Sequence, residues 1–167
     1  MKAAGILIAI ALALALQTTL ARFVVGGTAA LDLLLVAIVY VALTTGPVSG
    51  MIAGSVAGII QDALSTGVIG IGGLAKAIVG FVAGVIGQQF IVTAALPRFV
   101  MFLGATVLHA AIFMGLYVAL EVRDFPNPWA AVASQAVMNA AVGIIAFTII
   151  ESFPGFVERR RSRRVRH

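Results

Sequence analysis

Cysteine and charged residues are what this sequence has least of. None of its 167 residues is cysteine, so disulfides and thiol chemistry are excluded and the redox state of its compartment stays open. Charged residues make up only 10% of the chain, whereas hydrophobic residues make up 62% and the mean hydropathy is +1.14. Such a composition excludes a soluble domain of this size, and the long apolar runs predict a polytopic membrane protein.

The scarcity of polar residues also leaves no recognisable catalytic, cofactor or metal site. No acid, base and nucleophile can be assembled, and no spacing of His, Cys, Asp and Glu indicates a metal site. The glycine-rich stretch 65–73 lacks the lysine pattern of a phosphate-binding loop. We therefore predict a protein that is not an enzyme and that carries no cofactor or metal.

Positive charge is concentrated at the C-terminus. Without residues 158–167, the 6 acidic and 11 basic residues become five of each, so the net charge of +5 belongs to this tail. We divide the chain into a transmembrane domain, 1–157, and a basic cytoplasmic tail, 158–167. The tail either binds anionic lipid head groups or anchors the topology, and no nucleic acid is expected because no aromatic residues are interleaved with the arginines. These arginines are Arg159, Arg160, Arg161, Arg163, Arg164 and Arg166.

Six transmembrane helices are predicted, which makes the fold an all-α bundle. The first apolar run resembles a secretory signal in its composition, but membrane segments downstream favour a first transmembrane helix. Asp32 is the expected cap of the second helix, Pro47 fits the first turn of the third, and Asn127-Pro128 starts the sixth. The predicted helices are 3–21, 33–43, 47–64, 74–92, 98–120 and 127–151.

The basic residues near the helix ends predict the orientation. With six crossings, Lys2, Arg98 and the tail lie on one side of the membrane, opposite Arg22 and Arg123. Because basic residues favour the cytoplasmic side, both termini are predicted to be cytoplasmic.

Two series of small residues with a spacing of four are the most distinctive pattern. Positions four apart share one ridge of a helix, and glycines on that ridge allow another helix to approach closely. The first series ends in a carboxylate, the second begins with a lysine, and antiparallel packing brings these two charges to the same side. We expect Asp62 and Lys76 to form an ion pair, the alternative being that each faces water independently. The series are Gly46, Gly50, Gly54, Gly58 and Asp62, and Lys76, Gly80, Gly84 and Gln88.

The remaining polar residues of the apolar segments are scattered over several helices. Gln17, with the threonines after it, is expected to hydrogen-bond to neighbouring helices. For His109 the expected role is a neutral imidazole bonded to a neighbouring helix, and the alternative is a proton relay. Gln135, Asn139 and Gly143 form a further four-spaced ridge, whose polar side chains are expected to hold helices together.

At this point the sequence resembles the MreD family of rod-shape membrane proteins, over most of the chain. The resemblance rests on Gln17-Thr18-Thr19-Leu20, Asp32-Leu33-Leu34-Leu35, Tyr40, Gly46-Pro47 with the glycines after it, Asp62-Ala63-Leu64-Ser65 with Gly67 and Gly70, Gly80-Phe81, Ala83-Gly84 and Asn139-Ala140. Two positions depart from the family pattern. Leu31 stands where proline is common, and Thr66 stands where glycine often follows the serine.

The resemblance implies a six-helix protein of the bacterial inner membrane without enzymatic activity. It implies MreC as the main partner, with RodA, a class B penicillin-binding protein and MreB as further partners in directing peptidoglycan synthesis; dimerisation stays open. It also implies a fold similar to the substrate-binding subunits of energy-coupling-factor vitamin transporters. That similarity supplies the alternative function, a small-molecule binding or transport subunit.

Overall fold

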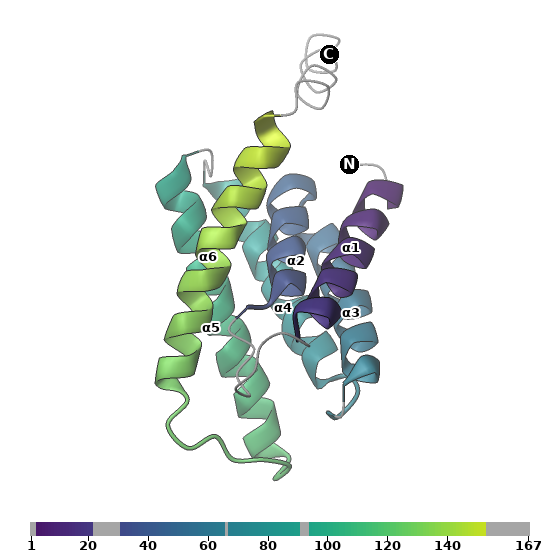
Figure 1. Cartoon of the computed structure of the whole chain (residues 1–167), viewed down its shortest axis with the longest axis vertical. Helices are drawn as coiled ribbons and strands as arrows, with labels where there is room; N and C mark the ends of the chain where they lie inside the picture. Colours follow the sequence, from purple (N-terminus) through teal and green to yellow (C-terminus); the bar gives the residue numbers. More distant parts are fainter. Residues whose placement is uncertain (1–2, 22–30, 66, 91–93, 153–167) are drawn as a thin grey trace.

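The computed structural model describes residues 3–21, 31–65, 67–90 and 94–152, and these ranges form six α-helices (Figure 1). They contain no strand, so the predicted all-α bundle is confirmed for this part of the chain. The basic tail, 158–167, lies outside the described residues. The helices are α1 (Ala3–Ala21), α2 (Leu33–Thr45), α3 (Pro47–Leu64), α4 (Ile71–Gln89), α5 (Ala95–Ala119) and α6 (Trp129–Ser152).

Helix α2 is the centre of the bundle and its shortest member. It packs against each of the other five helices and begins about half-way along the bundle (Figure 1). Its 13 residues rise about 20 Å, whereas a hydrocarbon core measures about 30 Å. Gly46, with φ +104°, separates it from α3, and Pro47 occupies the first turn of α3 as expected. The start of α2 therefore lies inside the bundle rather than at its surface.

Two predicted helix starts fall too late in the sequence. Helix α4 begins at Ile71 instead of Leu74, because Gly72 and Gly73 are helical rather than part of the turn. Helix α5 begins at Ala95, so Pro97 lies in its first turn, where a missing backbone N–H is tolerated. Helix α6 starts at Trp129, one residue later than the predicted first helical residue Pro128, whose carbonyl accepts a hydrogen bond from the backbone of Val132.

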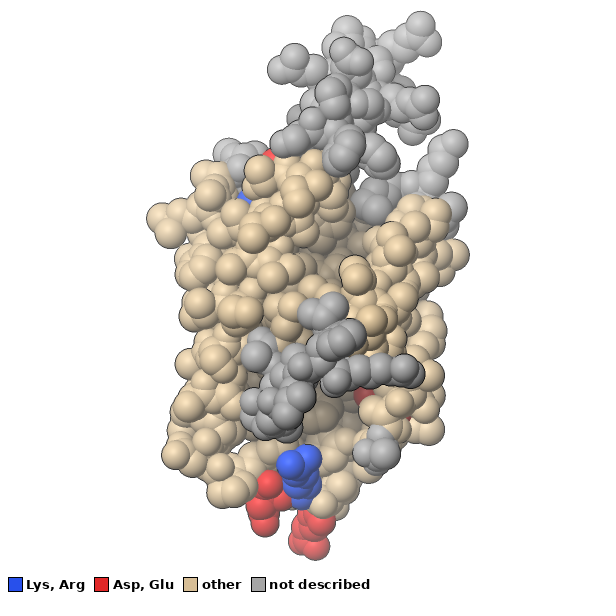
Figure 2. Space-filling model, in the orientation of Figure 1, with Lys and Arg blue, Asp and Glu red and all other residues tan. Residues whose placement is uncertain are grey.

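Within the described ranges, four helices are long and apolar enough to cross a membrane: Pro47–Leu64, Ile71–Gln89, Ala95–Ala119 and Trp129–Glu151. The apolar segments Gly5–Thr19 and Leu33–Thr45 are shorter. The face in Figure 2 is mostly uncharged, and its clearest group of charged side chains lies at the bottom, where α5 connects to α6. An apolar exterior with charges at its ends is what a lipid environment requires.

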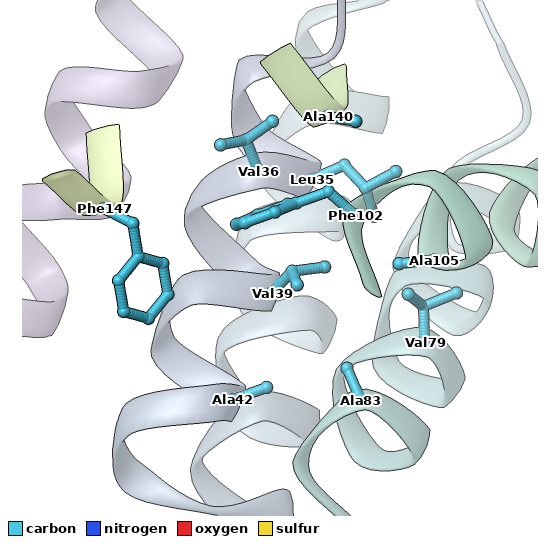
Figure 3. Packing of buried hydrophobic residues seen from close by; sticks show 10 residues of the cluster. All are labelled: Leu35, Val36, Val39, Ala42, Val79, Ala83, Phe102, Ala105, Ala140 and Phe147. Carbon is cyan, nitrogen blue, oxygen red and sulfur yellow. The ribbon is translucent and has the colours of Figure 1, made fainter. Parts of the chain in front are cut away.

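The main core lies where α2, α4, α5 and α6 meet (Figure 3). Phe102 of α5 is fully buried there and packs among small and branched side chains. The absence of a side chain at Gly143 on α6 makes room for that ring, because a Cβ there would come within 2.5 Å of Phe102. Core packing thus joins α2, α4, α5 and α6, and the buried polar residues Thr106 and Asn139 lie next to this core.

Candidate functional site

The glycines of α3 lie against α4, in the most extensive contact between two helices of the bundle. A Cβ added at Gly50 would come within 2.5 Å of the carbonyl oxygen of Gly80, and one at Gly58 within 2.6 Å of the Cα of Gly73. A Cβ at Gly54 would collide with the Lys76 carbonyl. The two backbones therefore touch along their whole length, as small-residue ridges in membranes allow.

The ends of the two series follow the same arrangement. A Cβ at Gly84 would meet the backbone of Pro47, and one at Gly46 would come within 3.1 Å of the Gln88 side-chain nitrogen. Gly46 also has φ +104°, a conformation that side chains rarely adopt. The start of the first series, Gly46, thus meets the end of the second series, Gly84 and Gln88, in the same α3–α4 contact.

The expected ion pair between Asp62 and Lys76 is wrong. The Oδ2 atom of Asp62 instead accepts hydrogen bonds from the backbone N–H groups of Gly70, at 2.9 Å, and Gly73, at 3.1 Å. These groups belong to the start of α4, where free amides and the helix dipole both favour a negative charge. A Cβ at Gly72 would collide with the same carboxylate. Asp62 therefore caps α4, and the glycines around it make room for the cap.

Lys76 pairs with Asp32. Its Nζ atom lies 3.0 Å from Oδ2 of Asp32 and 3.1 Å from Nε2 of His109, and all three residues are buried. An ammonium group only donates hydrogen bonds, so Nε2 of His109 accepts and the ring proton is assigned to Nδ1. The role expected for His109, a bond to a neighbouring helix, is confirmed, and its partner is a lysine.

The polar start of α2 is held from three sides. The Asp32 carboxylate accepts from the backbone of Leu35 at 2.9 Å, which confirms its role as the cap of α2. The side chain of Gln17 on α1 accepts from the backbone of Leu33 and donates to the carbonyl of Leu31. Asn139 on α6 accepts from the backbone of Asp32 at 2.9 Å. The backbone N–H groups at the start of α2 therefore have hydrogen-bond partners inside the bundle.

Asn139 extends this arrangement to α5, because its amide donates to the hydroxyl of Thr106 at 3.1 Å. We call the whole set the buried polar network: Gln17, Asp32, Lys76, Thr106, His109 and Asn139. Helices α1, α4, α5 and α6 each contribute to it around the start of α2. The threonines after Gln17 do not take part, contrary to expectation, because both donate to the carbonyl of Ala15 within α1.

Aromatic rings connect the network to the far end of α5. His109 stacks on Phe113 with centroids 5.7 Å apart, and Phe113 contacts Tyr117 at 4.7 Å. The Tyr117 hydroxyl accepts from the backbone of Val68 at 3.1 Å, and a Cβ at Gly67 would come within 2.6 Å of that oxygen. The turn between α3 and α4 is therefore fixed by α5 as well as by Asp62.

A second ion pair, Arg98–Glu151, lies at the end of the bundle where α5 begins and α6 ends. Arg98 donates to both carboxylate oxygens of Glu151, at 2.8 and 2.7 Å, and its guanidinium lies 4.2 Å from the ring centroid of Phe147. Sequence reasoning used Arg98 only as a marker of orientation. This bidentate pair joins the first turn of α5 to the last turn of α6.

Sequence reasoning also missed the pairing of Asp32 with Lys76, although a signal was present. The second predicted helix was too short to span a bilayer, so its capping aspartate had to lie within the membrane and needed a cation. Lys76 is the only lysine between Lys2 and the C-terminus.

The polar side chains of this site bind one another and so hold the helices together. No group of three His, Cys, Asp or Glu side chains that could hold a metal occurs among the described residues. Within the same ranges, no buried side-chain nitrogen or oxygen lacks a hydrogen-bond partner. Each member of the buried polar network is thus occupied by another part of the chain.

Comparison with protein families gives a match that extends over all six helices. The model of the family described as rod shape-determining protein MreD matches residues 3–154. Comparison with curated proteins and comparison with solved structures both gave no match.

Proposed function

The chain belongs to the MreD family of rod shape-determining proteins, and from this premise we propose that it is a non-enzymatic scaffold of the cell-elongation machinery. In this role it binds MreC in the bacterial inner membrane and helps to direct peptidoglycan synthesis. RodA, a class B penicillin-binding protein and MreB are further proposed partners.

The observation that carries the scaffold proposal is the buried polar network. Lys76, Asp32 and His109 bind one another, and Asn139 binds Asp32 and Thr106. A ligand-binding subunit needs polar groups that converge on a cavity and are free to bind the ligand. Here the same groups are used to hold the helices together, which favours a rigid bundle that presents its outer surface to partners.

The apolar exterior supports a role in the membrane. Large side chains such as Leu12, Ile52, Val100 and Ile145 are exposed on four different helices. Lipid or the transmembrane helix of a partner covers such surfaces, and packing of that kind does not need polar groups. The proposed orientation places both termini in the cytoplasm, where the arginine tail meets anionic lipids.

Co-purification with MreC tests the proposal. The full chain is expressed with tagged MreC, solubilised in detergent and isolated through the tag, and an unrelated single-pass membrane protein with the same tag is the control. We expect a stable complex with MreC and none with the control. Failure to bind MreC, together with a small molecule carried through purification of the chain alone, would support the vitamin-type binding subunit instead.

A further inference from the structure

Three titratable side chains meet inside the bundle: a carboxylate, an ammonium group and a neutral imidazole. Asp32 caps α2, Lys76 lies on α4 and His109 lies on α5. Gln17 of α1 and Asn139 of α6, which bind the backbone on either side of the Asp32 side chain, are uncharged. The carboxylate of α3, Asp62, binds the amides at the start of α4 instead. One carboxylate therefore pairs with one ammonium group, and the imidazole accepts a hydrogen bond from that ammonium group.

This geometry leaves no place for an additional proton. The Nε2 atom of His109 accepts from Lys76 at 3.1 Å, so a proton on this atom would replace the hydrogen bond by the contact of two cations. Among the residues that the structure describes, Asp32 is the one carboxylate that forms an ion pair with Lys76. Protonation of His109 and the arrangement as it stands exclude each other.

We propose that the Asp32–Lys76–His109 cluster is a proton-sensitive latch on the start of α2. In the latched state His109 is neutral and Lys76 is bound to both partners. When the latch opens, a proton from water forms an N–H bond at Nε2, the hydrogen bond from Lys76 is lost, and Asp32 is released from α4. The proton binds only the open state, so acidification shifts the population towards that state. This inference does not depend on which partner the protein binds.

The expected size of the shift follows from the ordinary pKa of histidine. For a group that titrates at about 6.5 in the open state and stays neutral in the latched state, lowering the pH from 7.5 to 5.5 raises the opening constant about tenfold. Carboxylates change little in this interval, because they titrate near pH 4.

Hydrogen–deuterium exchange at the start of α2 measures the opening directly. The backbone N–H groups of Asp32 and Leu33 bind Asn139 of α6 and Gln17 of α1, so they exchange when the start of α2 moves away from its neighbours. After correction for the intrinsic rate, we expect the protection of the Asp32 and Leu33 amides in the purified full chain to fall about tenfold between pH 7.5 and 5.5. Protection at the α3–α4 glycine contact should not change.

Two histidine variants show whether His109 causes the pH dependence of the protection. His109→Gln keeps a side-chain acceptor for Lys76 but cannot take up a proton, so its protection should be independent of pH. His167→Gln removes the other histidine and should behave as the wild type. Protection that is independent of pH in the wild type, or that falls equally in His109→Gln, would overturn the proposal.

Should His109→Gln not fold, nitrogen NMR of the His167→Gln protein decides the question, since His109 is then its only histidine. The proposal predicts an unprotonated Nε2 in the folded protein at pH 7.5. A doubly protonated ring in the folded protein at that pH would overturn it.

Discussion

Asp32 and Lys76 show at the scale of single residues how charges are accommodated in an apolar bundle. An isolated charge in a membrane segment costs on the order of 2.5–3.5 kcal/mol on insertion scales. The two atoms that carry the charges lie 3.0 Å apart, and both side chains are almost fully buried. Each charge is therefore compensated only while the other is present, and the pair should be treated as one unit.

A double-mutant cycle tests this pair. Asp32→Asn and Lys76→Met should each lower the free energy of unfolding by about 3–5 kcal/mol, because either change leaves a buried charge uncompensated. The double variant should lose at least 1 kcal/mol less than the sum of the two single losses. Unfolding in mixed micelles gives the values, and a coupling energy of zero would show that the charges do not meet.

Asp62 supplies the matched control for this cycle. Its carboxylate binds the amides of Gly70 and Gly73, not the ammonium group of Lys76. Asp62→Asn combined with Lys76→Met should therefore be additive within about 0.5 kcal/mol. A coupling energy between Asp62 and Lys76 as large as that between Asp32 and Lys76 would support the Asp62–Lys76 ion pair expected from the sequence.

The sequence could identify both carboxylates and the lysine but not their partners. The four-residue spacing and antiparallel packing bring the Asp62 and Lys76 ends of α3 and α4 together, as the structure shows. The partner is decided by tertiary details, since the free amides of α4 attract Asp62 and the depth of the α2 start brings Asp32 to Lys76. The contact of Asp62 with the free amides is not encoded in its local pattern, and the depth of Asp32 is indicated only by the shortness of the second predicted helix.

At the scale of elements, contact between backbones joins α3 to α4. Gly54 lies against the Lys76 carbonyl, whereas Gly104 on α5 has nothing within 4 Å of an added Cβ. We expect Gly54→Ala to destabilise the protein by about 1–3 kcal/mol through overpacking. Gly104→Ala should stabilise it by about 0.5–1 kcal/mol, because glycine disfavours a helix interior.

Thermal unfolding of the two variants in the same detergent checks this prediction. Both changes add one methyl group to a helical glycine, so the comparison isolates the contact with α4. Equal effects of the two substitutions would mean that α3 and α4 are not in backbone contact.

The helices themselves were largely predictable from the sequence. Gly46-Pro47 marks the boundary between α2 and α3, and the polar stretch 121–128 separates α5 from α6. The starts of α4 and α5 were placed too late because glycine and proline were taken as signs of a turn. Gly72 and Gly73 are instead glycines of the helix itself: an added Cβ would collide with Asp62 at Gly72 and come within 2.7 Å of Ile59 at Gly73. This is a requirement of packing that the local sequence does not reveal.

At the scale of the whole molecule, the account requires one orientation in the membrane. The distribution of basic residues near the helix ends predicts that both termini lie in the cytoplasm. A reporter enzyme that is active only in the cytoplasm, fused after His167, should therefore be active, and the same reporter inserted at Arg123 should be inactive. The reverse pattern would invert the whole topology.

The central claim is that this bundle is a partner-binding scaffold whose polar groups are already occupied. Native mass spectrometry of the chain purified together with MreC tests it most directly. The account predicts a complex whose mass equals the sum of the two chains in whole-number ratio, apart from lipids that are removed by stronger activation. A chain that carries a tightly bound small molecule and no MreC would contradict it.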